Sequence, residues 1–133
     1  EVNVKILRNQ NHALLANSDA VILASGTITL ESALYKTPMV VSYKGPLIAY
    51  LIYLLIRYIP FVSLPNIISG KKIVEEFIQF KAKPELIAHE VLGLLHNLDK
   101  REAMIDELSC IKEKLGNKVA SYEAAKIIYE SIK

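Results

Sequence analysis

Apolar residues along this chain come in short blocks separated by polar stretches, and the blocks predict strands. Val2, Val4 and Ile6 alternate with polar residues, which is typical of a strand. The block at 20–24 is uninterrupted, as in a strand that is buried on both faces. The sequence predicts two further strands, at 39–43 and 61–64.

The segments between these blocks have helical composition and predict helices at 12–16, 27–36 and 71–80. The second helix ends before Thr37-Pro38, because the ring of proline disfavours helical geometry in the preceding residue. Strands and helices that alternate across short connections are typical of a parallel sheet covered by helices. The predicted fold class is therefore α/β.

The last third of the chain predicts helices alone. Apolar residues recur there at helical spacing, and Asp99 with Glu102 resembles the capping box at the start of a helix. A last helix is predicted at 119–132. We therefore expect a β/α core at 1–83, followed by an all-helical scaffold at 84–133.

Residues 47–56 form one continuous apolar and aromatic run. As a helix this run is about 15 Å long, half of the ~30 Å hydrocarbon core of a bilayer, so it is too short to span a membrane. A helix that is apolar on all sides is either buried or lies in a membrane interface. Burial is the favoured interpretation. In the alternative the helix contacts lipid or a lipid-like substrate, with Tyr50, Tyr53 and Tyr58 at the level of the headgroups.

The junction between the strand at 20–24 and the helix that follows is a candidate anion site. Ser25, Gly26 and Thr27 form a small polar turn that leads directly into the helix. The free N–H groups and the dipole of a helix N-terminus favour an anion, commonly a phosphate. Glu31 lies one turn further along the same helix face. The pattern suits a nucleotide diphosphate whose ribose hydroxyls need an acceptor.

Two more polar residues are predicted to lie at the same edge of the sheet. In parallel sheets, ligands bind outside the carboxyl ends of the strands. Lys44 follows the strand at 39–43, and Asn66 follows the predicted strand at 61–64. Lys44 is expected either to meet the phosphates or to be a solvated turn residue. The charged pairs Lys71-Lys72 and Glu75-Glu76 are interpreted as solvated faces.

Composition narrows the function classes. The chain has 133 residues with 16 basic and 14 acidic side chains, a net charge of +2 that gives no reason to expect nucleic acid as a partner. A single cysteine excludes an internal disulfide and favours a reducing compartment. His89-Glu90 lacks the second histidine of a zinc-binding HExxH motif, so no metal site is predicted. The chain begins in strand-like sequence without Met, so we expect a fragment of a longer protein.

Four motifs resemble a known family when they are taken together. They are SGTITLE at 25–31, KTPMVVSYK at 36–44, VSLPNII at 62–68 and EEFIQ at 75–79. In this order and spacing they resemble the C-terminal part of the lipid-A-disaccharide synthase family, which are inverting glycosyltransferases of the two-domain GT-B type. The resemblance implies a Rossmann-like sheet that forms the C-terminal, donor-binding half of such an enzyme.

The resemblance also implies a reaction. A 2,3-diacylglucosamine is transferred from its UDP donor to 2,3-diacylglucosamine 1-phosphate, which gives lipid A disaccharide and UDP. No metal or organic cofactor is expected. The general base is expected on an N-terminal acceptor domain that is absent here, so this chain is expected to contain no catalytic residue and to be inactive alone.

Seven residues correspond to the donor site that the resemblance implies: Ser25, Gly26, Thr27, Glu31, Lys44, Asn66 and Gln79. The first three would hold the diphosphate, Glu31 the ribose and Lys44 the phosphate charge. Asn66 and Gln79 would line the donor pocket. Expected partners are the two acylated substrates, the cytoplasmic face of the inner membrane of a Gram-negative bacterium, and a second copy in a homodimer.

Two alternatives stay open at this point. One is another GT-B enzyme that uses a UDP-sugar, such as a peptidoglycan N-acetylglucosaminyltransferase or a UDP-sugar epimerase. The other is a non-catalytic interaction fragment in which the strand, turn and helix are only structural.

Overall fold

The computed structural model describes residues 3–56, 58–116 and 120–132, and its centre is a three-stranded parallel sheet. The strands, in spatial order, are β1 (Val21–Ala24), β2 (Met39–Tyr43) and β3 (Glu75–Ile78). Val21 pairs with Met39, and Val40 pairs with Glu75. All three strands run in the same direction, so their carboxyl ends meet at one edge. This arrangement confirms the predicted α/β class with a Rossmann-like parallel sheet.

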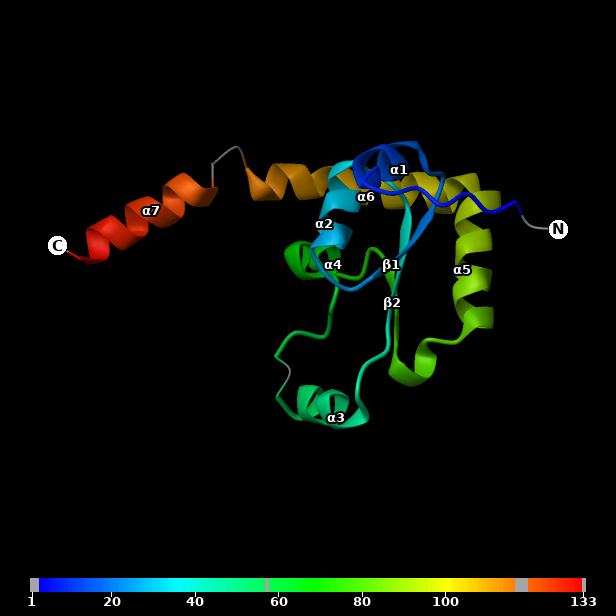
Figure 1. The fold of residues 1–133 in the computed structure, drawn as a ribbon, viewed down its shortest axis with the longest axis horizontal. Helices are drawn as coiled ribbons and strands as arrows, with labels where there is room; N and C mark the ends of the chain where they lie inside the picture. Colours follow the sequence, from blue (N-terminus) through cyan, green and yellow to red (C-terminus); the bar gives the residue numbers. More distant parts are fainter. Residues whose placement is uncertain (1–2, 57, 117–119, 133) are drawn as a thin grey trace.

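The helices of the described residues are α1 (Asn11–Asn17), α2 (Thr27–Leu34), α3 (Leu47–Ile56), α4 (Leu64–Ser69), α5 (Pro84–His96), α6 (Leu98–Leu115) and α7 (Ala120–Ser131), with a 3₁₀ turn η1 at Gln79–Lys81. Most of them pack around the sheet, whereas α3 and α7 lie apart from it (Figure 1). In Figure 1, α2 and α4 lie on one side of the sheet and α5 on the other, while α6 crosses their ends and packs against all three. The predicted all-helical ending is confirmed.

One hydrophobic core joins the sheet to the helices that follow it. Many of its fully buried side chains come from β2, α5 and α6, and these are Met39, Val40, Val41, Leu94, Leu108 and Ile111. Leu15 of α1 and Ala33 of α2 belong to the same core. The start of α6 is held by Asn97, whose side-chain oxygen accepts a hydrogen bond from the N–H of Lys100 at 3.0 Å. The cap is therefore Asn97, two residues before the predicted capping box at Asp99.

The first predicted strand is wrong over the described part of its range. Residues 3–6 form no strand, while Val2 lies outside the described residues. Val4 and Ile6 are 76% and 82% exposed, so their alternation with polar residues buries no face. A strand is stable only when a neighbour completes its hydrogen bonds, and the sheet of the described residues has no strand beside this segment.

The elements predicted at 61–64 and 71–80 are also wrong. The first is an irregular segment that leads into α4, because Pro65 occupies a first-turn position of a helix, where its missing N–H costs nothing. The second contains β3 instead of a helix. Its pairing with β2 overrides the helical composition of 71–80.

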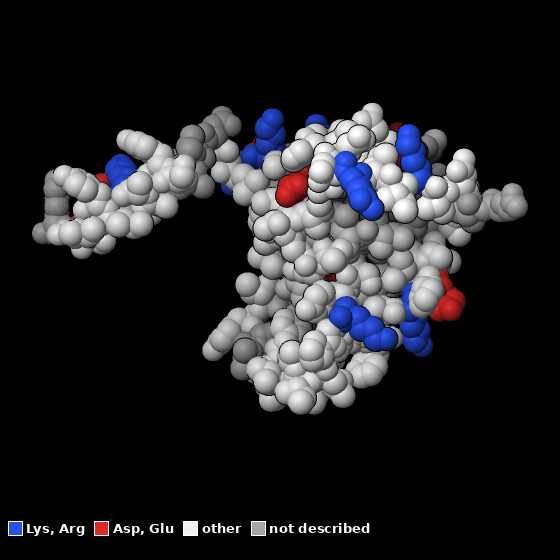
Figure 2. All heavy atoms as spheres, viewed as in Figure 1, with Lys and Arg blue, Asp and Glu red and all other residues white. Residues whose placement is uncertain are grey.

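The apolar helix α3 is exposed, so the predicted burial of 47–56 is wrong. It lies beyond the carboxyl ends of the strands, apart from the helices that cover the sheet (Figure 1). Ile48 and Leu55 are 74% and 86% exposed, and Figure 2 shows an almost uncharged surface over this part of the molecule. None of the helices in the described ranges is long and apolar enough to cross a membrane.

Candidate functional site at the carboxyl edge of the sheet

The N-terminus of α2 lies directly at the carboxyl end of β1. Only Ser25 and Gly26 separate the last strand residue from Thr27, the first residue of the helix. The N–H of Thr29 and its hydroxyl both donate to the carbonyl oxygen of Gly26, at 3.1 and 2.7 Å. Within the described ranges, the N–H groups of Thr27 and Ile28 donate to no protein acceptor. These two groups are available to an anion.

Gly26 leaves open space beside these N–H groups. Its backbone is extended, a conformation that any residue adopts, and a Cβ atom added there would meet no atom within 4 Å. Neither backbone conformation nor packing within this chain therefore explains a glycine at 26. The open space allows a ligand to approach the first turn of α2 closely.

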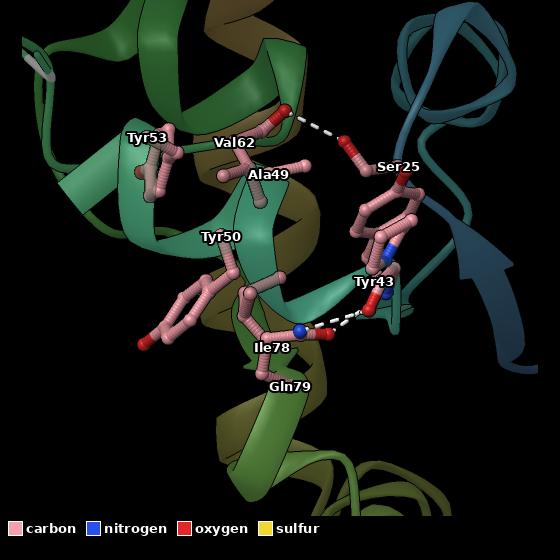
Figure 3. Close-up of a pocket in the computed structure, with 10 residues that line it drawn as sticks. Ser25, Tyr43, Ala49, Tyr50, Tyr53, Val62, Ile78 and Gln79 are labelled. Carbon is pink, nitrogen blue, oxygen red and sulfur yellow. Dashed lines mark hydrogen bonds between the residues drawn. The ribbon is translucent and has the colours of Figure 1, made fainter.

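A hollow of about 360 Å³ opens between the strand ends and α3. Each strand contributes to its lining at or just after its last residue, with Ser25, Tyr43 and Ile78. The helix α3 contributes Ala49, Tyr50 and Tyr53. In Figure 3, Ser25 and Tyr43 lie on one side of the hollow and Tyr53 on the other. The lining is mainly aromatic and aliphatic, and its polar side chains include those of Ser25 and Gln79.

Two side chains connect the loops around this hollow. The hydroxyl of Ser25 donates to the carbonyl oxygen of Val62 at 2.8 Å. The Gln79 side chain binds the backbone of Gly45 twice: its Nε2 donates to the carbonyl at 2.9 Å, and its Oε1 accepts from the N–H at 2.8 Å. Both contacts are drawn in Figure 3. Gln79 is buried and adopts a positive φ of 51°, a conformation uncommon for a residue other than glycine.

The segment before α4 is held by one carboxylate, that of Glu76 in β3. Its oxygens accept from the N–H of Val62 at 3.1 Å, from the N–H of Ser63 at 2.9 Å and from the Ser63 hydroxyl at 2.6 Å. Glu76 is half-buried, so its interpretation as part of a solvated face is wrong. Glu75 is also only half-buried as a residue, but its side chain is 37% exposed and pairs with Lys72 at 2.6 Å.

Asn66 adds a fourth hydrogen bond to this carboxylate. Its Nδ2 donates to Glu76 Oε1 at 2.8 Å and to the carbonyl of Val74 at 2.9 Å. Its Oδ1 accepts from the N–H groups of Ile73 and Val74. The side chain is fully buried, and its amide is occupied by partners within the chain. Through Glu76, Asn66 therefore stabilises the segment before α4, and it does not line the hollow.

The structure brings together only some of the residues singled out in the sequence. Ser25 and Gln79 line the same hollow. The other five lie outside its lining. Gly26 and Thr27 are exposed at the start of α2, Glu31 is half-buried one turn later, Lys44 is exposed in the turn after β2, and Asn66 is buried. Neither Glu31 nor Lys44 forms an ion pair with another described residue.

The sequence pattern did not predict the tyrosines that line the hollow or the role of Glu76. The alternative interpretation of the 47–56 helix placed Tyr50 and Tyr53 at lipid headgroups, but both line the hollow, while Tyr58 is fully exposed. Their spacing of three residues, which places them on one helix face, was the available indication. For Glu76 no local indication exists, because three of its four hydrogen-bond donors lie 13 or more residues earlier in the chain.

Comparison with known proteins identifies the family. The sequence profile described as "Lipid-A-disaccharide synthetase" matches residues 1–132. The lipid-A-disaccharide synthase of Syntrophus aciditrophicus is 39% identical over 130 residues, which are 98% of this chain and 34% of that protein. The enzyme of the same name from Rickettsia prowazekii is 43% identical over 131 residues, 96% of this chain and 34% of that protein.

A third relative, the lipid-A-disaccharide synthase of Acinetobacter baylyi, is 47% identical over 96 residues, 72% of this chain and 24% of that protein. The chain therefore spans about a third of the length of the curated relatives it matches most fully. Because the family profile matches almost every residue, the chain belongs to the lipid-A-disaccharide synthetase family.

Proposed function

We propose that this chain is the donor-binding part of a glycosyltransferase of lipid A biosynthesis. The complete enzyme would transfer 2,3-diacylglucosamine from UDP to 2,3-diacylglucosamine 1-phosphate, with release of UDP and formation of lipid A disaccharide. One observation carries the assignment of this part: α2 presents unpaired N–H groups at the carboxyl edge of a parallel sheet, where such folds bind nucleotides.

The diphosphate is assigned to the turn Ser25, Gly26 and Thr27. The free N–H groups of α2 supply donors, and the open space at Gly26 admits the phosphate oxygens. Lys44, exposed in the turn after β2, supplies a cation for the phosphate charge. Glu31, with no ion-pair partner in the described part of the chain, accepts hydrogen bonds from the ribose hydroxyls.

Asn66 and Gln79 are assigned to the donor site through the loops that they hold. Gln79 lines the hollow and fixes the turn that contains Gly45. Asn66 acts through Glu76, which fixes the segment at Val62. The general base is assigned to the rest of the complete enzyme, so residues 1–133 bind the donor without turnover and without a metal or organic cofactor.

A titration with UDP tests the nucleotide site. We expect the folded chain to bind UDP with a Kd of roughly millimolar or tighter, and we expect Glu31→Ala to weaken UDP about tenfold, the value of one charged hydrogen bond. Binding of inorganic diphosphate should not change, because it lacks the ribose. Calorimetry measures both ligands, with Glu102→Ala, an exposed glutamate of α6, as the matched control.

Two outcomes contradict these assignments. Equal losses of UDP and diphosphate binding in Glu31→Ala would show that Glu31 does not bind the ribose. If a folded sample binds no UDP, the chain does not contain the proposed nucleotide site.

We assign the outer face of α3 to the cytoplasmic surface of the inner membrane. Both proposed substrates are acylated, and an exposed helix with an apolar outer face inserts into the boundary of headgroups and acyl chains. Leu55 is 86% exposed and lies near the end of this helix. A homodimer would present two such helices, and thereby strengthen attachment.

Leu55→Asp should reduce co-sedimentation of the chain with anionic vesicles by roughly tenfold, since a large apolar contact is replaced by a charge. The control is Leu92→Asp on α5, where the leucine is 52% exposed and lies outside the assigned surface. Unchanged binding of Leu55→Asp, or equal losses in both variants, would show that α3 is not the contact.

A further inference from the structure

A second hollow adjoins the one between α3 and the strand ends. It has a volume of about 310 Å³ and shares four lining residues with the first: Tyr50, Tyr53, Val62 and Ile78. Beyond this shared wall it is lined by Leu54, Pro60 and Phe80, and by the charged residues Glu76 and Lys81. The ring of Phe80 meets Tyr50 edge-on, with ring centroids 6.2 Å apart. The two hollows together form one continuous surface next to α3, which is mainly aromatic and aliphatic and includes Glu76 and Lys81 in its second part.

We propose that this surface binds an acyl chain of the donor sugar. The inference rests on the proposed function and adds the place where the acyl chain binds. If the diphosphate lies at Gly26 and Thr27, and the ribose one turn along α2 at Glu31, the nucleoside extends away from the hollow. The sugar then lies toward Ser25, which lines the hollow, whereas Thr27 and Glu31 do not.

The polar groups of the lining favour an acyl chain over a nucleobase. The Ser25 hydroxyl already donates to Val62, and both polar atoms of the Gln79 amide bind Gly45. The Glu76 carboxylate of the second hollow already accepts hydrogen bonds from Val62, Ser63 and Asn66. A base placed here would give up hydrogen bonds to water and find these groups engaged. A hydrocarbon chain loses no hydrogen bonds and gains contact with the tyrosine faces, Ile78 and Val62.

The position of α3 explains how a chain reaches this surface. The outward face of the helix is aliphatic and exposed at Ile48 and Leu55, while its inward face contributes Tyr50 and Tyr53. An acyl chain that leaves a lipid surface in contact with the outward face passes from one apolar environment to another. The distance between the membrane and the hollow is then only the width of one helix, α3.

The test titrates the 133-residue chain with two probes, UDP and sodium laurate below its micellar concentration. Binding of laurate is followed by calorimetry and by the tyrosine fluorescence. Ala49→Trp places a large ring in the first hollow, and Ala88→Trp, on an exposed position of α5, is the matched control. We expect Ala49→Trp to weaken laurate roughly tenfold, with UDP unchanged and with no effect of Ala88→Trp.

A milder variant, Ala49→Phe, gives the same readout if the tryptophan disturbs folding. Laurate binding that is equal in wild type and Ala49→Phe overturns the inference, because the acyl chain of laurate then binds at another place. So does a loss of UDP with laurate retained, which would make the hollow a nucleobase site. UDP binding without any laurate binding overturns the inference alone, whereas laurate binding without UDP overturns the proposed function.

Discussion

Glu76→Gln should lower the free energy of unfolding by about 3 kcal/mol, which is roughly 10 °C in Tm for a chain of this size. The Glu76 carboxylate accepts hydrogen bonds from two backbone N–H groups, the Ser63 hydroxyl and the Asn66 amide. Glutamine can place its one acceptor oxygen where it binds Ser63 and Asn66, but these three hydrogen bonds then lose their charged acceptor. Its NH₂ group would face the N–H of Val62, which is left without its best acceptor. The weaker acceptor and this one unsatisfied donor together account for the expected loss.

Urea denaturation followed by circular dichroism measures this change. Glu75→Gln is the matched control, because the neighbouring carboxylate is partly exposed and, among the described residues, forms an ion pair with Lys72 alone. It should change stability by less than about 1 kcal/mol, as expected for a surface ion pair. Similar small shifts in both variants would contradict the anchoring role of Glu76.

Leu108→Ala should cost about 3 kcal/mol, within the range for a leucine removed from a packed core. Leu108 lies in α6 and is fully buried in the core that also contains side chains of β2 and α5. Because the core is shared, we expect the sheet and the helices α5 and α6 to unfold in one transition. Thermal unfolding monitored by far-ultraviolet and near-ultraviolet circular dichroism tests whether the two signals coincide.

Leu92→Ala provides the comparison, since Leu92 is 52% exposed on α5. Its effect should stay below about 1 kcal/mol. A comparably small effect of Leu108→Ala, or separate transitions for the two signals, would mean that α6 is docked onto the sheet and is not part of its core.

Local pattern was sufficient for the elements whose structure depends on their own residues. The strand β2 was predicted with its observed bounds. The helices α2 and α3 begin at the predicted residues, and α3 also ends as predicted, whereas α2 ends two residues earlier than predicted. Each is a continuous apolar block or a helical segment between turn residues. The junction at Ser25 was therefore predictable, because a strand followed by a small polar turn and a helix defines it.

Pattern failed where a distant partner determines the structure. Residues 75–78 become a strand only because they pair with β2. The segment at Val62 and Ser63 was predicted as a strand, and its N–H groups are bonded, but to a side chain. The exposure of α3 and the direction of its tyrosines depend on the angle at which the helix leaves β2, and sequence periodicity does not contain that angle.

The order of the strands has a consequence for assembly. In the described part of the chain, β1 and β3 each have a neighbour on one side only. Their outer backbone N–H and C=O groups are templates onto which a further strand can be added. A longer chain that contains this sequence can therefore extend the sheet at either edge without changing the existing register. The same open edges make the isolated chain prone to edge-to-edge aggregation, a hazard that rises with concentration.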